Sequence, residues 1–303
     1  MISRIEMRLY KKEHIDLSQG MCVRLSGQGV QIRIVDVQRT LQEEGAVQKD
    51  DVVQKDDDTK RADAFPEMDA GEKVLLITDE MEMYLILQKS GCAVAFWQDE
   101  EDPFPSDEID YLILKAEELD AKDLDRIYRR LTGEPWDILE TERLLVRETM
   151  VRDVDDFYRI YKDAQITKYM EDLFPDPEQE RDYIRSYIRN IYSFYEYGIW
   201  TVVRKEDRAV IGRAGMEPAK ADEYPELGFV IGTAWQRKGY AKEALEAIIR
   251  YAAEELGIMT LQASVHELNR PSRELLEKLG LESVKTDKEG RILYQTKRMQ
   301  DSR

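Results

Sequence analysis

The segment ELGFVIGTAWQRKGYAKEALEAIIRYAAEELG, residues 226–257, joins a short apolar strand to a long amphipathic helix. Apolar side chains recur at helical spacing and predict one buried face, formed by Leu245, Ile248, Ile249, Ala252 and Leu256. The start of such a helix carries free backbone N–H groups and the positive end of the helix dipole. The segment therefore predicts an anion-binding turn between a strand and a helix.

That turn has the composition of a phosphate site. It consists of Gln236, Arg237, Lys238, Gly239, Tyr240 and Ala241. The glycine lets a ligand lie against the backbone where a Cβ would intrude, and two cations add positive charge. A pyrophosphate would suit the turn; the alternative is a plain amphipathic helix with a glycine near its start. The turn matches neither the Walker loop nor the three-glycine dinucleotide fingerprint.

Outward from this turn, residues 138–303 predict alternating strands and helices that form one domain. The expected strands cover residues 142–148, 200–205, 209–216, 226–231, 260–265, 282–286 and 291–297. The expected helices cover residues 153–163, 178–195, 239–257 and 270–280.

Several motifs in this region resemble the GNAT superfamily of N-acyltransferases, in its ribosomal-protein-alanine N-acetyltransferase-like branch. The acetyl-CoA signature Gln/Arg-x-x-Gly-x-Gly/Ala is present as Gln236-x-x-Gly239-x-Ala241. The opening TERLLVRETMVRDVDDFYRIYKD, the glycine pair in VIGRAGM and the later NRPS at 269–272 follow in the same order and spacing. The resemblance covers essentially all of 138–303 and implies a mixed, mostly antiparallel sheet that is splayed at the cofactor site.

The resemblance also implies which residues bind acetyl-CoA. The backbone of Phe229, Val230 and Ile231 would pair with the pantetheine arm, and the backbone of residues 236–241 would hold the pyrophosphate. Asn269 and Ser272 match positions that touch the cofactor arm near its thioester. An Asn before a helix is also an ordinary cap, and this alternative stays open for Asn269.

Direct transfer to a primary amine needs a base, because an ammonium group has no lone pair and a lysine-like amine has a pKa near ~10.4. The resemblance assigns this role to Glu226; the alternative is a strand glutamate that faces solvent. The N–H of Val230 is the expected oxyanion donor. Leu276 occupies the position where many relatives carry the acid Tyr, so the general acid is unassigned, with Tyr294 and Tyr240 as substitutes. The missing Tyr keeps a rival function open, a non-catalytic sensor of acyl-CoA.

The acceptor would lie against the segment from residue 168 to 200, which is crowded with aromatic residues, most of them expected in the core. Glu171, Asp172 and Asp176 either attract a cationic amine or form a solvated acidic loop. The acceptor is a primary amine of a small molecule or of a peptide N-terminus, and the sequence does not distinguish these.

The N-terminal half predicts a different organisation. Residues 20–37 suggest a hairpin and residues 48–72 a charged linker, so 1–72 is one predicted segment. Residues 73–137 alternate strands with helices and predict a small doubly wound α/β domain. It resembles part of a haloacid-dehalogenase-like domain, but Gln38 stands where the acid/base Asp of the nucleophile loop would be. An accessory, non-catalytic role is expected.

Composition limits the partners. Of 303 residues, 45 are basic and 63 acidic, net −18, and residues 1–137 hold 18 basic against 32 acidic side chains, net −14. That acidity disfavours nucleic acid and anionic membranes as partners. Two cysteines and two histidines provide neither a disulfide framework nor a zinc site. A cytoplasmic protein without a metal is expected, and dimerisation of the chain stays open.

Overall fold

The computed structural model describes residues 2–28, 30–36, 72–99, 108–219 and 224–297. The chain divides into two compact units, Met1–Glu134 and Pro135–Arg303. Among the described segments, none of the helices combines the length and the apolarity that a bilayer span requires.

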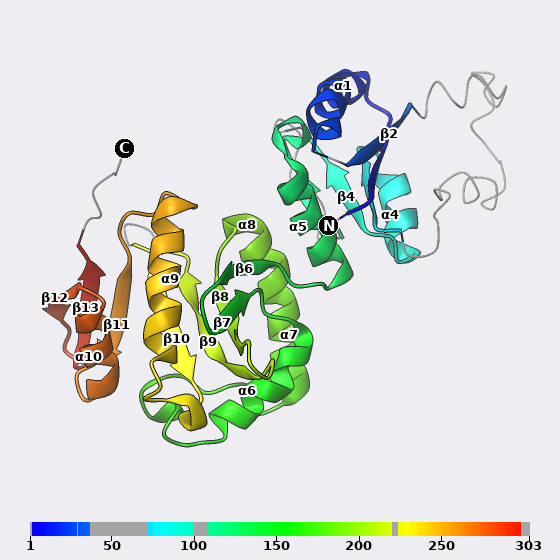
Figure 1. Cartoon of the computed structure of the whole chain (residues 1–303). Coiled ribbons are helices and arrows are strands. Elements are labelled where there is room, and N and C mark those ends of the chain that lie inside the picture. The colour runs from blue at the N-terminus through cyan, green and yellow to red at the C-terminus, as the bar shows by residue number, and fades with distance from the viewer. Residues whose placement is uncertain (1, 29, 37–71, 100–107, 220–223, 298–303) are drawn as a thin grey trace, which may run out of the picture. The chain divides into compact units, whose positions relative to one another are not determined.

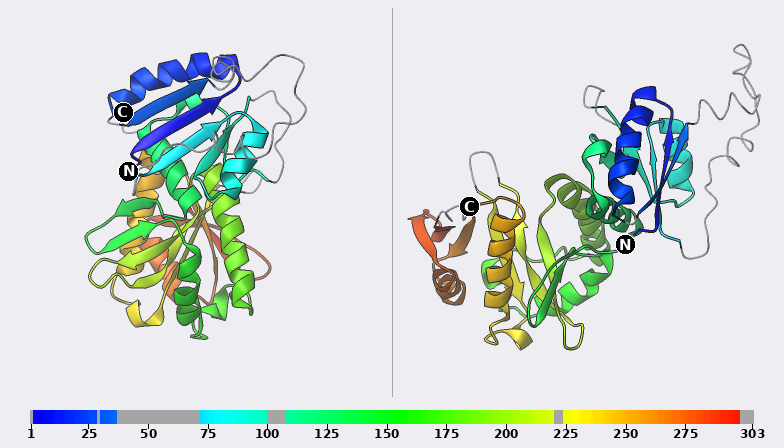
Figure 2. Two further views of the ribbon diagram at one scale, coloured as in Figure 1. Left: turned by 90° about the vertical axis from the view of Figure 1, so that its right-hand side faces the viewer. Right: turned by 45° about the horizontal axis from the view of Figure 1, so that its top comes forward.

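The first unit is a doubly wound parallel sheet with strand order β2-β1-β3-β4-β5. Its strands are β1 Arg4–Leu9, β2 Gln31–Asp36, β3 Val74–Thr78, β4 Val94–Trp97 and β5 Leu112–Ile113. Its helices are α1 Lys12–Ser26, α4 Met81–Lys89 and α5 Ala121–Thr132, with a 3-10 turn η1 at Ala116–Glu118. In the right-hand view of Figure 2, α1 (blue) and α4 (cyan) lie on opposite sides of the sheet. The predicted doubly wound architecture is confirmed.

The alternating direction of the side chains along β3 explains why helices cover both faces of this sheet. Leu75 and Ile77 share a buried cluster with side chains of α1 and α5, whereas Val74 and Leu76 pack with α4. Because successive strand side chains point to opposite faces, a continuous apolar strand is covered by helices on both sides.

The predicted hairpin over residues 20–37 is wrong. Residues 12–26 form α1, which connects β1 to the parallel strand β2, with Arg4 opposite Gln31. The buried face of α1 consists of His14, Ser18, Met21 and Leu25, at helical spacing. Because β1 pairs with both β2 and β3, the residues before position 37 and those after position 73 contribute to one sheet. The predicted linker at 48–72 lies, except for Glu72, outside the described residues, as does Gln38.

His14 holds α1 against the ends of two strands. Its Nδ1 lies 3.0 Å from Asp79 Oδ2, just after β3, and its Nε2 lies 2.7 Å from Asp99 Oδ1, just after β4. The ring stacks on Trp97 with centroids 4.2 Å apart. Burial lowers the pKa of His14, but hydrogen bonds to the two carboxylates outweigh burial and leave the pKa above its usual value.

The second unit contains an eight-stranded mixed sheet of order β12-β13-β11-β10-β9-β8-β7-β6, in which only the β10–β11 pair is parallel. The strands are β6 Asp137–Glu140, β7 Leu144–Arg147, β8 Ile199–Arg204, β9 Val210–Glu217, β10 Glu226–Ile231, β11 Gln262–His266, β12 Leu281–Thr286 and β13 Arg291–Thr296. This is the mixed, mostly antiparallel sheet that the resemblance implies.

Helices cover both faces of this sheet. They are α6 Val154–Tyr161, α7 Pro177–Tyr187, α8 Ser193–Tyr195, α9 Tyr240–Glu254 and α10 Arg270–Lys278, and one π-helical turn, η4 Ile188–Tyr192, links α7 to α8. Leu227 and Ile231 of β10 share a buried cluster with α9, whereas Val230 packs with α6. Figure 1 shows α9 alongside β10.

The glycine pair in β9 has a packing role. A Cβ on Gly215 would lie 2.0 Å from the carbonyl oxygen of Gly198, and a Cβ on Gly212 would lie 2.1 Å from that of Val230. No side chain fits at such distances, so these two positions admit only glycine. They bring neighbouring backbone into close contact at the strand that borders β10.

Candidate functional site

The β10–β11 pair opens immediately after it begins. Along β9, strand β10 is paired from Glu226 to Ile231, whereas along β11 it is paired only at Glu226 with Gln262. The two neighbours therefore separate beyond Leu227, as the resemblance implies. A gap between adjacent strands leaves backbone donors and acceptors for another extended chain.

Successive residues of β10 direct their backbone N–H and C=O groups alternately toward β9 and toward this gap. The N–H of Gly232 donates to Ile211 O of β9 at 2.9 Å. Because every second residue of a strand directs its backbone groups to the same neighbour, the N–H and C=O of Val230 also bond to β9. The backbone groups of Phe229 and Ile231 then face the β11 side, and Ile231 O accepts from Gln236 Nε2 at 2.9 Å. The expected oxyanion donor, the N–H of Val230, belongs to the β9 ladder, and that assignment is corrected. The N–H groups of Phe229 and Ile231, and not that of Val230, are directed into the gap.

The turn before α9 is shaped by two left-handed residues, Arg237 with φ +60° and Gly239 with φ +84°. Gly239 immediately precedes α9, and no side chain caps the helix. Arg237 and Lys238 are exposed, and Gln236 ties the turn to β10 through its bond to Ile231. The result is an uncapped helix start with bare backbone and two cations, the arrangement that binds phosphate.

Arg143, at the edge of β7, braces this turn and was not singled out from the sequence. Its Nε donates to Glu243 Oε2 at 2.7 Å and its Nη1 to Lys238 O at 3.0 Å. Its guanidinium lies 4.4 Å from the centre of the Tyr240 ring, and its Nη2 would be 3.4 Å from a Cβ on Gly239. Burial raises the pKa of Glu243, but hydrogen bonds from Thr141 and Arg143 leave it below its usual value.

A cavity of about 460 Å³ lies beside β10, where Gly228, Phe229 and Val230 line it. Its other walls come from the segment 170–175, from α6 and α7, and from Arg213 and Glu217 of β9. Of the predicted acidic residues, Glu171 and Asp172 line the cavity, whereas Asp176 caps α7 by accepting from Glu178 N at 3.0 Å. Of the nine aromatic residues between 168 and 200, only Tyr187, Tyr192 and Trp200 are buried, so the prediction that most of them lie in the core is wrong. Phe174 and Tyr183 are exposed and line the cavity.

Glu226 is the first residue of β10 and the one that pairs with β11. Its Oε1 accepts from the N–H of Ser264 on β11 at 3.2 Å, and Glu217 lies directly opposite on β9. Like charges directly opposite in a sheet are destabilising. A sheet that keeps two carboxylates here concentrates negative charge beside the gap, where a cationic amine would be attracted.

Comparison with known proteins agrees with this geometry. Residues 143–282 match the family model of the acetyltransferase (GNAT) domain. The chain is 31% identical over 146 residues to the uncharacterized N-acetyltransferase p20 of Bacillus licheniformis, covering 48% of this chain and 82% of that protein. The chain belongs to the GNAT acetyltransferase family. It is also 30% identical over 154 residues to the ribosomal protein uS5-alanine N-acetyltransferase of Escherichia coli strain K12, covering 48% of this chain and 77% of that protein.

Membership makes this GNAT protein an acyltransferase that uses acetyl-CoA and acetylates an amine. Two observations test whether its residues fit that cosubstrate. The gap beside Phe229 and Ile231 offers backbone groups to an extended amide chain. The cradle at Gly239 is open because a Cβ is absent. Both features fit a long molecule with amide groups and a pyrophosphate.

The remaining predicted residues of the GNAT unit occupy structural positions. Asn269 Oδ1 accepts from Ser272 N at 3.4 Å and caps α10, the alternative left open for it. Leu276 is fully buried. Tyr294 is buried and donates to Glu277 Oε1 at 3.1 Å, and Tyr240 is buried beneath Arg143. Neither tyrosine presents a free hydroxyl as an acid.

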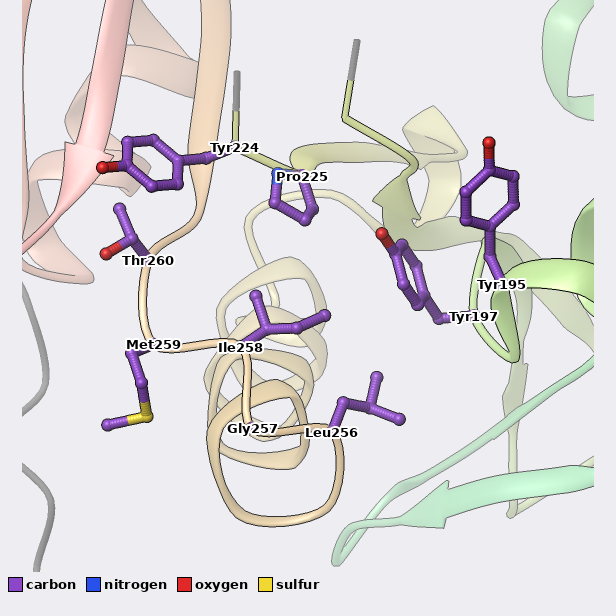
Figure 3. A pocket seen from close by; sticks show the side chains of 9 residues that line it. All are labelled: Tyr195, Tyr197, Tyr224, Pro225, Leu256, Gly257, Ile258, Met259 and Thr260. Carbon is purple, nitrogen blue, oxygen red and sulfur yellow. The ribbon is translucent and has the colours of Figure 1, made fainter. Parts of the chain in front are cut away.

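A second cavity of the GNAT unit, about 640 Å³ in volume, lies where β10 and β11 begin (Figure 3). Figure 3 shows Tyr197 and Tyr195 on one side of it, and Leu256, Ile258 and Tyr224 across from them. None of its nine lining residues is charged. It therefore lacks the groups that would hold a pyrophosphate or an ammonium ion.

Proposed function

We propose that this acetyltransferase transfers the acetyl group of acetyl-CoA directly to the primary amine of a small molecule or a peptide N-terminus. The observation that supports it best is the confinement of β10–β11 pairing to one residue pair, with a cavity lined by residues 228–230 of β10. Acetyl-CoA supplies an activated acyl group, and the cavity supplies room for an amine next to it.

The binding roles proposed for acetyl-CoA follow the backbone directions. Phe229 and Ile231 would pair with its amide arm, while Val230 supports the strand from the β9 side. The backbone of residues 236–241, with the charges of Arg237 and Lys238, would hold the pyrophosphate. Asn269 and Ser272 would contribute by fixing the start of α10 beside the arm.

Glu226 is the proposed base. Its carboxylate lies on the strand that borders the cavity and accepts a hydrogen bond from Ser264 N, which fixes its position. It would remove the proton of the ammonium, directly or through water, before the amine attacks. The N–H of Phe229 would then stabilise the oxyanion, and a thiolate with a pKa near ~8.5 can leave without a protein acid.

The test measures free thiol released from acetyl-CoA with a panel of amines and peptide N-termini. Glu226→Gln should lower kcat by about 10²- to 10⁴-fold, the usual contribution of a general base, and leave CoA affinity nearly unchanged. Glu246→Gln, on the exposed side of α9 and ion-paired with Lys242, is the matched control and should be fully active. A wild-type chain that binds CoA and releases no thiol above background is a sensor, and retained activity in Glu226→Gln refutes the base.

We also propose that the first unit is an accessory, non-catalytic domain and that the protein works in the cytoplasm. In support, Cys22 and Cys92 are free thiols, as is usual in a reducing compartment. Dimerisation stays a prediction; sedimentation of the full chain measures it.

A further inference from the structure

Arg213 is the one cation among the described residues that line the acceptor cavity. It lies on β9 directly opposite Val230, so its side chain is on the same face of the sheet as the Val230 side chain. Adjacent strands are about 4.8 Å apart. The guanidinium therefore belongs to the wall next to the backbone where the amine would react.

The charge of Arg213 has no direct counter-ion. Within the part of the chain that the structure describes, no carboxylate forms an ion pair with it, and its buried Nε has no hydrogen-bond partner. Its guanidinium lies 4.8 Å from the centre of the Phe157 ring. Glu180 attracts it from farther away, but Glu180 Oε2 already accepts from Phe174 N at 3.1 Å.

The side chain of Tyr161 forms a hydrogen bond with the guanidinium, so the unsatisfied donor is the Nε–H. A buried donor without an acceptor is costly, and proteins rarely leave one unpaired without a reason. A ligand that supplies the missing oxygen would remove the cost. Guanidinium groups favour planar oxygen pairs such as carboxylates and also bind carbonyl oxygens.

We infer that Arg213 binds a carboxylate or carbonyl oxygen of the acceptor, next to the amine that is acetylated. The acceptor is then an α-amino acyl unit, as in a free amino acid or the first residue of a peptide, and not a simple alkylamine or polyamine. This inference rests on the proposed function, since it assigns the acceptor of that same site.

The rest of the cavity fits such a unit. The rings of Phe174 and Tyr183, with centroids 5.9 Å apart, and that of Tyr161 offer an apolar surface to its side chain. Glu217 lies at the same wall and attracts the ammonium form of the amine. The volume is at the lower end of the range of small-molecule pockets, about 300 to 1,000 Å³, and suits one or two residues.

The experiment compares acceptors that differ only in the group beside the amine. Thiol release from acetyl-CoA is measured with phenylalanine, with a peptide that begins with phenylalanine, and with phenethylamine, which lacks the carboxylate. Either of the first two should exceed phenethylamine in kcat/KM by about 10- to 100-fold, the value of a hydrogen bond to a charged group. The faster of the two identifies whether the oxygen comes from a carboxylate or a peptide carbonyl.

Two variants assign that preference to the guanidinium. Arg213→Gln should lower the kcat/KM ratio of the phenylalanine acceptors over phenethylamine toward one, and Arg213→Lys should restore part of that ratio. Arg185→Gln, an exposed arginine ion-paired with Asp182, is the control and keeps the full preference. Equal wild-type rates for all three acceptors overturn the inference even if Arg213→Gln does not fold. Absence of thiol release with every amine overturns the proposed function instead.

Discussion

Gly239 and Gly280 have nearly the same backbone conformation, with φ +84° and +83°, and only the first lies in the cofactor turn. Alanine in a left-handed conformation costs about 1 to 2 kcal/mol. Steric overlap adds little in either place, since a Cβ at Gly239 would lie 3.4 Å from Arg143 Nη2 and one at Gly280 meets nothing within 4 Å. Gly239→Ala and Gly280→Ala should therefore lose the same free energy of unfolding.

The two variants should differ only in binding. A methyl group at Gly239 occupies the surface that a pyrophosphate must approach, and each charge-assisted hydrogen bond lost costs about 1.5 to 3 kcal/mol, or about 10- to 100-fold in affinity. Calorimetric titration should show that loss for CoA with Gly239→Ala and none with Gly280→Ala. Pantetheine, which lacks the pyrophosphate, should bind both variants equally. Unchanged CoA affinity in Gly239→Ala, or an equal loss in Gly280→Ala, would refute the assignment of the turn.

Two further predictions concern charged groups. Arg143→Gln should weaken CoA binding by about tenfold in the same titration. The ion pair with Glu243, whose arginine side chain is 42% exposed, contributes about 1 kcal/mol or less, and the hydrogen bond to Lys238 O contributes about as much again. An unchanged dissociation constant contradicts the bracing role. Because the folded pKa of His14 is raised, its contribution to stability is fully present below the unfolded pKa of about 6.5 and is lost as the pH rises through the folded value. Thermal melting should therefore show a larger loss of stability for the wild type than for His14→Gln between about pH 6 and about pH 8. Equal losses in the two proteins would refute this role of His14.

The helix α1 shows why part of the first unit could not be predicted. Two of its four buried residues, His14 and Ser18, are polar, so an apolar periodicity is absent where the helix packs. His14 is tolerated there because Asp79 and Asp99 bond to it, and these residues are 65 and 85 positions away. A pattern within 15 residues contains no information about such partners.

The cofactor turn was predictable because its chemistry is local. A strand, a left-handed glycine and an uncapped helix start follow one another between residues 226 and 240, and each has a sequence signal. Arg143 carries no such signal, since its partners Lys238 and Glu243 are 95 and 100 residues away. Arg213 and Glu217 join the cavity only through the register of β9 against β10.

The same register separates roles that the sequence assigns to one block. A family pattern gives Phe229, Val230 and Ile231 as neighbours along the cofactor, but strand geometry sends alternate residues to opposite partners. Val230 bonds to β9 and places its side chain against α6, so it holds the strand in position. Phe229 and Ile231 direct their backbone into the gap, and of these two only Phe229 also lines the acceptor cavity. The side of the strand toward which an N–H points, and not its position in a motif, therefore decides which amide can meet the developing oxyanion.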